Sequence, residues 1–339
     1  MKHPQKIAIV RLTAMGDIVH SAVALQFIKR VYPEAKISWI VEEKFASILE
    51  NSPEIEQIVP VNLHSLKKNK SLKNIKSIYS RLKSSGEFDL IIDVQGLIKS
   101  AVTARVLGKD IAGLDFDSAR EPIASFFYKK KYNIDCKEVA PFRFASLIAR
   151  ALKFNLSKDD LLEKRAYLFW DKSKDYKKID KYFSVSKKNI IITTGASNFS
   201  KLYPKEKFVE LISHLRMYNI LLIAGDGQER LDAQFIESKS IAKLFPKLTL
   251  NELKYTISKA DLLIGNDTGP SHIAWALNRP SIVLFGSTPS SMMMQTPKNI
   301  AITSGKRINK CRFDKNDKSI SKISPQTIVK EAKRLLGDE

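Results

Sequence analysis

Lys6-Ile-Ala-Ile-Val-Arg-Leu-Thr-Ala-Met-Gly-Asp-Ile-Val-His20: this segment of the chain predicts the class of fold. An apolar run of mostly β-branched residues leads into a short turn, Thr13-Ala14-Met15-Gly16-Asp17. A segment with helical periodicity follows over residues 18–31 and is closed by Tyr32-Pro33. A strand, a turn and a helix in this order form the first unit of a parallel α/β sheet.

The same arrangement returns far downstream, where residues 262–266 lead into Asn266-Asp267-Thr268-Gly269-Pro270-Ser271-His272. Strand-like runs rich in Val and Ile recur in both halves without clean alternation, which is typical of strands buried on both faces. They lie at residues 7–12, 37–41, 57–61, 90–94, 189–194, 220–224, 262–266 and 281–285. The sequence therefore predicts two Rossmann-like, doubly wound domains that face a cleft.

The composition suggests where these domains begin and end. We expect an N-terminal domain over residues 1–160, a linker rich in Lys, Asp and Ser over 161–188 and a second domain over 189–323. A final helix over 324–339 is predicted by Ser324-Pro325, because serine caps helices and proline suits the first turn. A chain of 339 residues is long enough for two cores without disulfides.

The chain lacks the usual signals for export, membrane insertion or a structural metal. Its two cysteines, Cys136 and Cys311, form no CxxC motif, so we expect inert thiols in a reducing compartment. No signal peptide or apolar run of about 18 residues is present. We expect a cytosolic, soluble protein without a metal or an organic cofactor.

The formal net charge is +21, which admits nucleic acid, anionic lipid or a polyanionic substrate as a partner. Residues 62–83 carry seven Lys or Arg and no acid, with Leu72, Ile75, Tyr79 and Leu82 on one helical face. Two interpretations remain open. This segment packs as an ordinary surface helix, or it contacts an anionic membrane surface.

The first turn offers a base and the second turn offers an anion site. Asp17 stands at a helix N-terminus, where a carboxylate stays ionised and can take a proton from a hydroxyl. In the second turn, Thr268 and Gly269 leave backbone N–H groups pointing outward, which suits a diphosphate. One carboxylate opposite a phosphate site favours sugar transfer over glycoside hydrolysis, which generally needs two carboxylates.

Two loops of the second domain add groups to the anion site. The loop 195–200 brings Ser197 and then Lys201 to the ends of the strands, and a lysine there offers a point charge for a phosphate. After residues 220–224, Asp226 or Glu229 can accept hydrogen bonds from a ribose or sugar hydroxyl. Each of these residues also has a plain structural interpretation as a solvated or capping side chain.

Four motifs resemble those of the lipopolysaccharide heptosyltransferases, most closely the type I enzymes. They are Thr13-Ala14-Met15-Gly16-Asp17-Ile18-Val19-His20, Asp93-Val94-Gln95-Gly96-Leu97-Ile98-Lys99-Ser100, Ala119-Arg120-Glu121-Pro122-Ile123-Ala124-Ser125 and Asp267-Thr268-Gly269-Pro270-Ser271-His272. The resemblance implies a GT-B fold, an ADP-heptose donor and the inner Kdo of Kdo-lipid A as acceptor. It also implies inversion at the anomeric carbon without a metal, at the cytosolic face of the inner membrane.

The resemblance also implies roles for individual residues, in three groups. Asp17 is similar to the catalytic base of the family. The donor side would comprise Ser197, Lys201, Glu229, Asp267, Thr268, Gly269 and His272. The acceptor side would comprise Thr13, Met15, Gly16, Lys99, Arg120 and Arg143, whereas His64 stands where relatives carry arginine.

Three other functions compete with the type I heptosyltransferase interpretation. A type II heptosyltransferase would use the same donor but a heptosylated acceptor, and the motifs do not fully separate the two types. A basic nucleic-acid-binding protein would explain the charge, but no aromatic RNA platform or helix-turn-helix is recognisable, so we expect no nucleic-acid partner. A nucleotide-dependent oxidoreductase is disfavoured because residues 11–16 lack GxGxxG.

Overall fold

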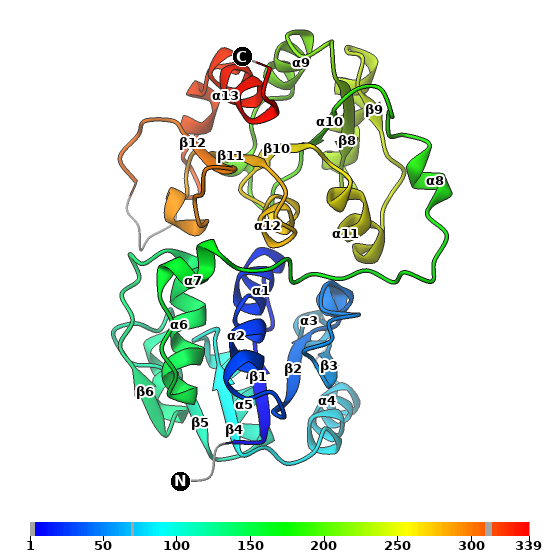
Figure 1. Cartoon of the computed structure of the whole chain (residues 1–339). Helices are drawn as coiled ribbons and strands as arrows, with labels where there is room; N and C mark the ends of the chain where they lie inside the picture. Colours follow the sequence, from blue (N-terminus) through cyan, green and yellow to red (C-terminus); the bar gives the residue numbers. More distant parts are fainter. Residues whose placement is uncertain (1–3, 69–70, 309–313, 339) are drawn as a thin grey trace. The chain divides into compact units, whose positions relative to one another are not determined.

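Two parallel six-stranded sheets, one in each half of the chain, form the framework of the protein (Figure 1). The computed structural model describes residues 4–68, 71–308 and 314–338. The chain divides between Phe169 and Trp170 into two compact units, which we call unit 1 and unit 2. The predicted α/β class with two doubly wound sheets is confirmed.

The sheet of unit 1 has the strand order β3-β2-β1-β4-β5-β6, and every pair is parallel. The order reverses at β1, so the ends of β1 and β4 flank the switch point where such sheets bind ligands. The strands are β1 (Lys6–Val10), β2 (Lys36–Glu42), β3 (Gln57–Val61), β4 (Leu90–Asp93), β5 (Ile111–Leu114) and β6 (Lys130–Tyr132).

Helices cover both faces of this sheet. On one face, α4 (Leu72–Ser84), α5 (Ile98–Leu107) and the 3₁₀ helix η2 (Pro122–Phe127) pack on one cluster of buried side chains from the strands. The other helical elements are α1 (Met15–Ala22), α2 (Ala24–Val31), η1 (Glu43–Ile48), α3 (Leu63–Lys68), α6 (Ala140–Leu152) and α7 (Lys158–Leu162). Of these, α6 contacts both α1 and α2.

The sheet of unit 2 has the order β12-β11-β10-β7-β8-β9, again all parallel, with its switch point between β10 and β7. The strands are β7 (Asn189–Thr193), β8 (Asn219–Ile223), β9 (Lys243–Leu244), β10 (Leu262–Asn266), β11 (Ser281–Phe285) and β12 (Asn299–Thr303). The helical elements are α8 (Lys177–Asp180), η3 (Phe199–Lys201), α9 (Lys205–Ser213), α10 (Gln228–Ser238), α11 (Leu250–Ser258), α12 (Gly269–Ala276), η4 (Ser290–Met292), η5 (Ser319–Lys322) and α13 (Pro325–Leu336).

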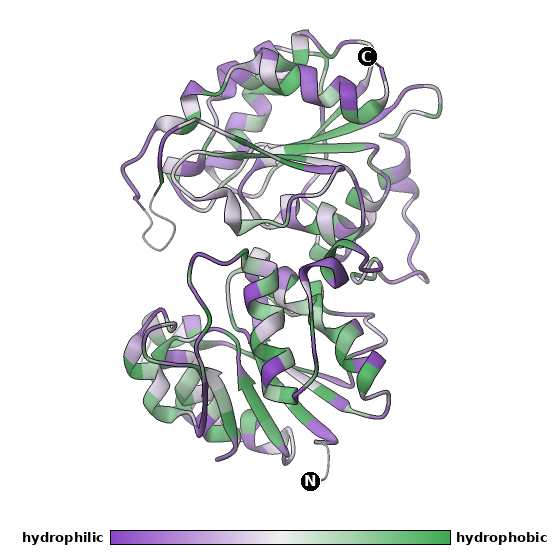
Figure 2. Cartoon of the chain, turned by 60° about the vertical axis from the view of Figure 1, so that its left-hand side comes forward, coloured by the Kyte–Doolittle hydropathy of each residue, from purple (hydrophilic) through white to green (hydrophobic). Residues whose placement is uncertain are grey.

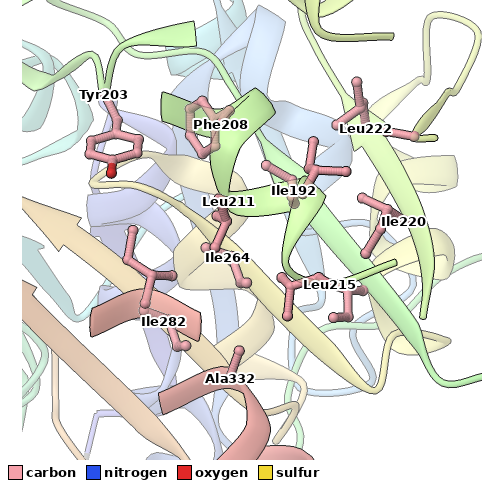
Figure 3. Packing of buried hydrophobic residues seen from close by; sticks show 14 of the residues in the cluster. Ile192, Tyr203, Phe208, Leu211, Leu215, Ile220, Leu222, Ile264, Ile282 and Ala332 are labelled. Carbon is pink, nitrogen blue, oxygen red and sulfur yellow. The ribbon is translucent and has the colours of Figure 1, made fainter. Parts of the chain in front are cut away.

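One large cluster of buried apolar side chains holds the sheet and helices of unit 2 together. Phe208 and Leu211 of α9 and Ala332 of α13 pack against Ile192 and Ile264 of the central strands (Figure 3). The same pattern holds in much of the chain, since the central strands are mostly apolar and most hydrophilic residues lie on the helices and loops (Figure 2). None of the described helices is long and apolar enough to cross a membrane.

The stretch 161–188 does not run free between the units. The Arg165 amide donates to Gln26 Oε1 at 3.0 Å in unit 1. Beyond the boundary, the Asp171 amide donates to Asn251 Oδ1 at 2.8 Å, and Asn251 donates to the Tyr176 hydroxyl at 2.7 Å in unit 2. Each end of the stretch is therefore fixed to its own unit.

Three local expectations need correction. The helix expected over 18–31 is two helices, α1 and α2, which meet at Val23. The basic helix expected over 62–83 is the pair α3 and α4, on either side of residues 69–70, which lie outside the described residues. Cys136 was expected to be an inert thiol but is disulfide-bonded, and Cys311 lies outside the described residues.

Candidate active site

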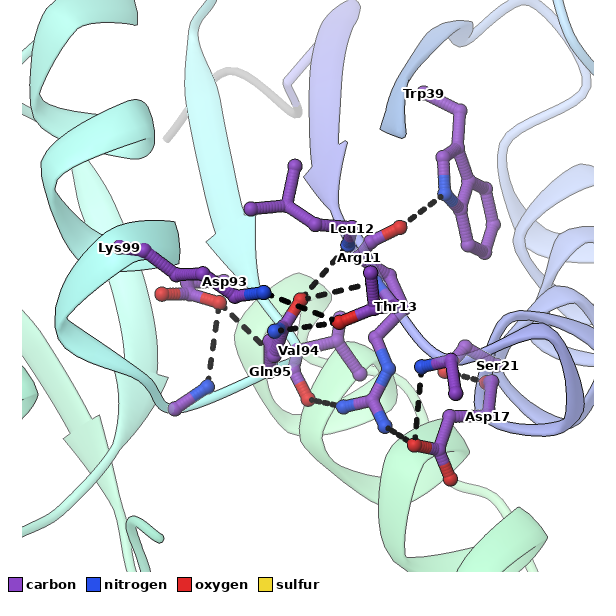
Figure 4. A network of polar contacts seen from close by, with 12 residues as sticks. Arg11, Leu12, Thr13, Asp17, Ser21, Trp39, Asp93, Val94, Gln95 and Lys99 are labelled. Atoms are coloured by element: carbon purple, nitrogen blue, oxygen red, sulfur yellow. Dashed lines mark hydrogen bonds and ion pairs between the residues drawn. The ribbon is translucent and has the colours of Figure 1, made fainter. Parts of the chain in front are cut away.

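Asp17 lies in the first turn of α1, directly after the turn that follows β1. Its Oδ2 atom accepts a hydrogen bond from the Ala14 amide at 3.4 Å and pairs with Arg11 Nη2 at 2.7 Å (Figure 4). Within the described residues, the hydrogen bond and the ion pair of this carboxylate both go to Oδ2. The carboxylate thus has a fixed oxygen and a second one, Oδ1, that can accept a proton from a substrate.

Arg11 holds this carboxylate from a rigid position. Its side chain is 5% exposed, whereas that of Asp17 is 27% exposed. The guanidinium also donates to the Val94 carbonyl at 2.8 Å and stacks over the ring of Phe144 at 4.3 Å. A buried, planar cation held at three points orients a carboxylate better than a flexible lysine would.

Gln95 organises the other side of the same turn. Its Oε1 accepts hydrogen bonds from the Leu12 and Thr13 amides at 2.8 and 3.3 Å, and its Nε2 donates to Thr13 Oγ1 at 3.3 Å (Figure 4). Lys99 Nζ, from the first turn of α5, donates to the same Thr13 hydroxyl at 3.3 Å. Thr13, Lys99 and Asp17 therefore belong to one edge of unit 1.

Asp93, the last residue of β4, supports this edge from the interior of unit 1. It is fully buried and accepts hydrogen bonds from the Gln95 and Gly96 amides and from the hydroxyls of Ser100 and Tyr128, at 2.7–3.3 Å. Burial raises the pKa of Asp93, although the four hydrogen bonds oppose that shift. The site edge thus rests on a polar anchor inside the sheet.

The two predicted acceptor-side arginines differ in environment. Arg143 is partly buried on α6, where its Nη2 donates to the Ser118 carbonyl at 2.5 Å. Burial and the nearby positive charge of Arg11 lower the pKa of Arg143. Arg120 is exposed before η2, Met15 and Gly16 are half-buried in α1, and His64 is exposed on α3.

In unit 2, Asp267 lies at the end of β10, and its two oxygens are both engaged. Oδ1 is 3.0 Å from His272 Nε2, while Oδ2 pairs with Lys201 Nζ at 2.5 Å and accepts from Thr288 Oγ1 at 2.8 Å. Burial would raise the pKa of Asp267, but Lys201 and His272 outweigh it and hold the pKa well below its usual range. Asp267 is a buried carboxylate that fixes a lysine.

The helix after Asp267 begins with groups suited to an anion. Thr268 is the N-cap of α12, and Gly269 and Pro270 form its first turn. Ser271 is turned inward, because its hydroxyl donates to the Asn266 carbonyl at 2.7 Å. The first amides of a helix have no intrahelical acceptor, so this N-terminus and Lys201 together offer hydrogen bonds and positive charge.

Glu229 lies in the first turn of α10 and packs against glycine backbone. Its Oε2 accepts from the Gly225 amide at 3.1 Å. A Cβ added to Gly195 would lie 2.1 Å from the same oxygen, so only glycine leaves room for the carboxylate there. Glu229 therefore reaches back to the loop after β7, where Ser197 is exposed.

Residues 75–322 match the model of glycosyltransferase family 9 (heptosyltransferase). The chain belongs to this family. It is 38% identical to lipopolysaccharide heptosyltransferase 1 of Campylobacter coli, over 98% of this chain and 100% of the relative. The solved Escherichia coli heptosyltransferase WaaC with ADP has a TM-score of 0.79 at 24% identity, covering 97% of this chain and 99% of that one. WaaC with ADP-2-deoxy-2-fluoro heptose has a TM-score of 0.75 at 25% identity, with the same coverage.

As a member of family 9, the chain is a glycosyltransferase. The family match begins after Asp17, but the alignment with the Campylobacter coli relative spans almost the whole chain. Two hollows of about 400 and 430 Å³ on unit 2 contain none of the predicted site residues. No group of three His, Cys, Asp or Glu suited to a metal occurs within residues 4–68, 71–308 and 314–338.

Sequence reasoning missed four residues that organise the candidate site. Arg11 follows an apolar run and has no motif character of its own. Gln95 lies in a matched motif, yet nothing local indicates that it bonds to a turn 82 residues away. Asp93 of the same motif acts from inside the sheet, where it accepts a hydrogen bond from the Gln95 amide. Thr288, which donates to Asp267, comes from a segment without a recognisable signal.

Proposed function

We propose that this glycosyltransferase transfers L-glycero-D-manno-heptose from ADP-heptose to the inner Kdo of Kdo-lipid A, with inversion and without a metal. The observation that carries the proposal is the Asp17 carboxylate, with one oxygen fixed by Arg11 and the other open, in a chain of the heptosyltransferase family. The name of the Campylobacter coli relative and the ligand of the second WaaC structure support the acceptor class and the donor.

In the proposed reaction, Asp17 Oδ1 takes the proton of a Kdo hydroxyl. The hydroxyl oxygen then attacks the anomeric carbon of heptose, and the bond from that carbon to the β-phosphate oxygen breaks. ADP leaves with the electron pair. A single displacement of this kind inverts the anomeric configuration, and it requires one base rather than two carboxylates.

The donor diphosphate would bind at the N-terminus of α12 and at Lys201. The amides of Gly269 and Ser271 and the Thr268 hydroxyl offer hydrogen bonds, and Lys201 offers charge, so the departing diphosphate can be stabilised without a cation from solution. Asp267 and His272 would position Lys201 rather than touch the donor, because both oxygens of Asp267 are engaged. Ser197 and Glu229 would accept hydrogen bonds from the sugar or ribose hydroxyls.

The acceptor would bind at the edge of unit 1. Lys99, Arg120 and Arg143 would face the Kdo carboxylate and the lipid A phosphates, and Thr13, Met15 and Gly16 would line the turn. The donor is soluble and the acceptor is a lipid, so we place the reaction at the cytosolic surface of the inner membrane. The proposal requires that ligands held by the two units meet during turnover.

The decisive experiment incubates the purified protein with ADP-heptose and Kdo-lipid A in the presence of a chelator. We expect a product heavier by one heptose, and no product from an acceptor that already carries heptose. Transfer only to the heptosylated acceptor would make the chain a type II enzyme. Loss of activity on chelation that Mg²⁺ restores would contradict the metal-independent mechanism.

The role of Asp17 needs its own comparison. Asp17→Asn keeps the shape of the side chain but removes the base, so we expect transfer to fall about 100- to 10,000-fold while ADP affinity stays unchanged. Asp110→Asn is the matched control, because Asp110 is half-exposed in a surface pair with Lys129. Equal turnover of Asp17→Asn and the parent protein would exclude Asp17 as the base.

A further inference from the structure

The exposed apolar side chains of unit 1 gather on one layer of the fold. Among the described residues, the large apolar side chains that unit 1 exposes are mostly on α4, α5, η2 and the loop before η2, with Val31 and Leu162 elsewhere. They include Leu72, which is 82% exposed, and Phe126, which is 71% exposed. The set on this layer comprises Leu72, Ile75, Tyr79, Ile98, Val102, Phe116, Ile123 and Phe126.

These side chains form one surface, because the elements that carry them are neighbours. Helix α4 contacts α5, and α5 contacts η2. The rings of Phe116 and Phe126 lie edge to face at 6.2 Å. The inner side of the same layer is already used, since Leu82, Ala101 and Ala124 pack into the core of unit 1. The layer is therefore apolar on both sides, although one side is sufficient for folding.

The helical elements of this layer carry charges of one sign, whereas the loop before η2 also carries the exposed Asp117 and Glu121. Helices α4 and α5 and η2 carry six Lys or Arg and no Asp or Glu. Lys83 Nζ lies 5.8 Å from the centre of the Tyr79 ring, and Lys131 Nζ of β6 lies 5.7 Å from that of Phe126. Lysines that run alongside exposed rings can keep their ammonium groups at a charged boundary while the rings enter an apolar phase.

We infer that this outer face of α4, α5 and η2, with Phe116, docks on the surface of an anionic lipid bilayer. Apolar side chains enter the boundary between headgroups and acyl chains, and the flanking cations meet lipid phosphates. Nucleic acid would match the charge, but Leu72, Ile75, Val102 and Ile123 offer it neither stacking nor hydrogen bonds. Acyl chains match both features.

The position of this face fits the proposed function, and the biological role of membrane docking rests on that function. Helix α5 begins with Ile98, which is exposed, and Lys99, which reaches Thr13 beside the candidate base. Docking through this layer would therefore bring the edge of unit 1 that carries Asp17 close to lipid headgroups. A lipid-linked acceptor would be met there without leaving the bilayer.

The test is co-sedimentation of the full chain with vesicles of phosphatidylcholine containing about one third phosphatidylglycerol, without any acceptor lipid. The test variant combines Leu72→Ser, Ile75→Ser and Phe126→Ser. The control combines Met217→Ser, Leu231→Ser and Ile241→Ser, which removes three apolar side chains of unit 2 that are 48–59% exposed. We expect the test variant to bind at least about 10-fold more weakly and the control to bind like the parent chain.

Several outcomes would overturn the inference. The first is a parent chain that does not bind the anionic vesicles, and the second is a test variant that binds them as well as the control does. The third is a parent chain that forms oligomers through this face, as measured by analytical ultracentrifugation. Binding of random oligonucleotides that the test variant loses would assign the face to nucleic acid instead.

A second readout separates this inference from the proposed function. With an acceptor freed of its acyl chains, the test variant should transfer heptose as fast as the parent chain, because the reaction no longer needs a membrane. A parent chain that binds vesicles but transfers heptose to no acceptor would contradict the proposed function alone. Vesicle binding lost together with transfer to the soluble acceptor would show that the substitutions damage the fold, and Phe126→Ser alone would then decide.

Discussion

Arg11 Nη2 lies 2.7 Å from Asp17 Oδ2, and the two side chains differ sharply in exposure, at 5% and 27%. The arginine belongs to the interior of unit 1 and the aspartate to its edge. This pairing engages Oδ2, whereas no hydrogen bond or ion pair is seen at Oδ1 among the described residues, so the carboxylate is held by one of its two oxygens. We therefore regard Arg11 as a positioning residue for the base.

Replacing Arg11 should affect turnover more than binding. In Arg11→Gln the carboxylate of Asp17 loses its fixed partner, so we expect kcat to fall about 10- to 100-fold while the KM for ADP-heptose changes little. Arg11→Lys should restore part of the rate, since it returns the charge without the planar fork. Steady-state kinetics with Arg30→Gln as control check this, because Arg30 forms an exposed pair with Asp160. An unchanged kcat would contradict the positioning role.

Much of the fold could be predicted from the sequence, because buried parallel strands leave long Val and Ile runs. Four strands escaped prediction: β5 (Ile111–Leu114), β6 with two lysines among its three residues, β9 with only Lys243 and Leu244, and β12 (Asn299–Thr303). Of these, β6, β9 and β12 lie at sheet edges. Edge strands bury fewer side chains and so leave a weaker apolar signal. Helix ends were less predictable, and the break between α1 and α2 at Val23 has no proline or glycine to mark it.

The site divides in the same way. Asp17 and the Thr268-Gly269 turn have local signals, because they stand where a strand gives way to a helix. Arg11 and Gln95 do not, since their roles depend on contacts with residues distant in the sequence or on the depth at which a side chain is buried. The engagement of both oxygens of Asp267 is likewise a tertiary property. We therefore propose that Asp267 supports Lys201, whereas the resemblance implies a contact with the donor.

Asp267 should make the stability of unit 2 depend on acid pH. Its pKa in the folded chain lies below the unfolded value of 3.8, so the stabilisation is fully present above that value and is lost as the pH falls further. Asp267→Asn removes this pH dependence, and it costs on the order of 3–5 kcal/mol at neutral pH because Lys201 loses its buried partner.

Urea unfolding between neutral pH and about pH 2 measures this effect. With Trp39 and Trp170 replaced by Phe, the fluorescence reports Trp275 of α12, the helix that follows Asp267. Asp226→Asn is the control, because Asp226 forms an exposed pair with Lys247. A parent chain and an Asp267→Asn variant that lose stability in parallel on acidification would contradict this account.

Gly195 and Glu229 should act on donor affinity as one unit. An added methyl group at Gly195 must displace the Glu229 carboxylate, since the two would lie 2.1 Å apart. If Glu229 accepts a hydrogen bond from the donor, Gly195→Ala and Glu229→Ala should each weaken ADP-heptose binding about 10-fold. The double variant should be no weaker than either single one.

Calorimetric titration of the four proteins of this cycle gives the coupling, with the exposed Glu206→Ala as control. Additive losses would mean that Gly195 acts through the backbone of its own loop. Unchanged affinity in Glu229→Ala would remove Glu229 from the donor site.

Lys164 should make unit 1 more stable at alkaline pH. Burial lowers the pKa of Lys164 to about 7, so between this value and 10.5 the unfolded chain binds a proton that the folded chain does not. Over that window the free energy of unfolding rises with pH, and below about pH 7 the full cost of the buried ammonium is present.

The variant Lys164→Met should lack this dependence of the unfolding free energy on pH. The difference in unfolding free energy between the two proteins should therefore shift by a few kcal/mol, at about 1.4 kcal/mol per pKa unit. Unfolding followed through Trp39, with Trp170 and Trp275 replaced by Phe, checks this in unit 1, and parallel pH profiles for parent and variant would refute the buried-lysine explanation.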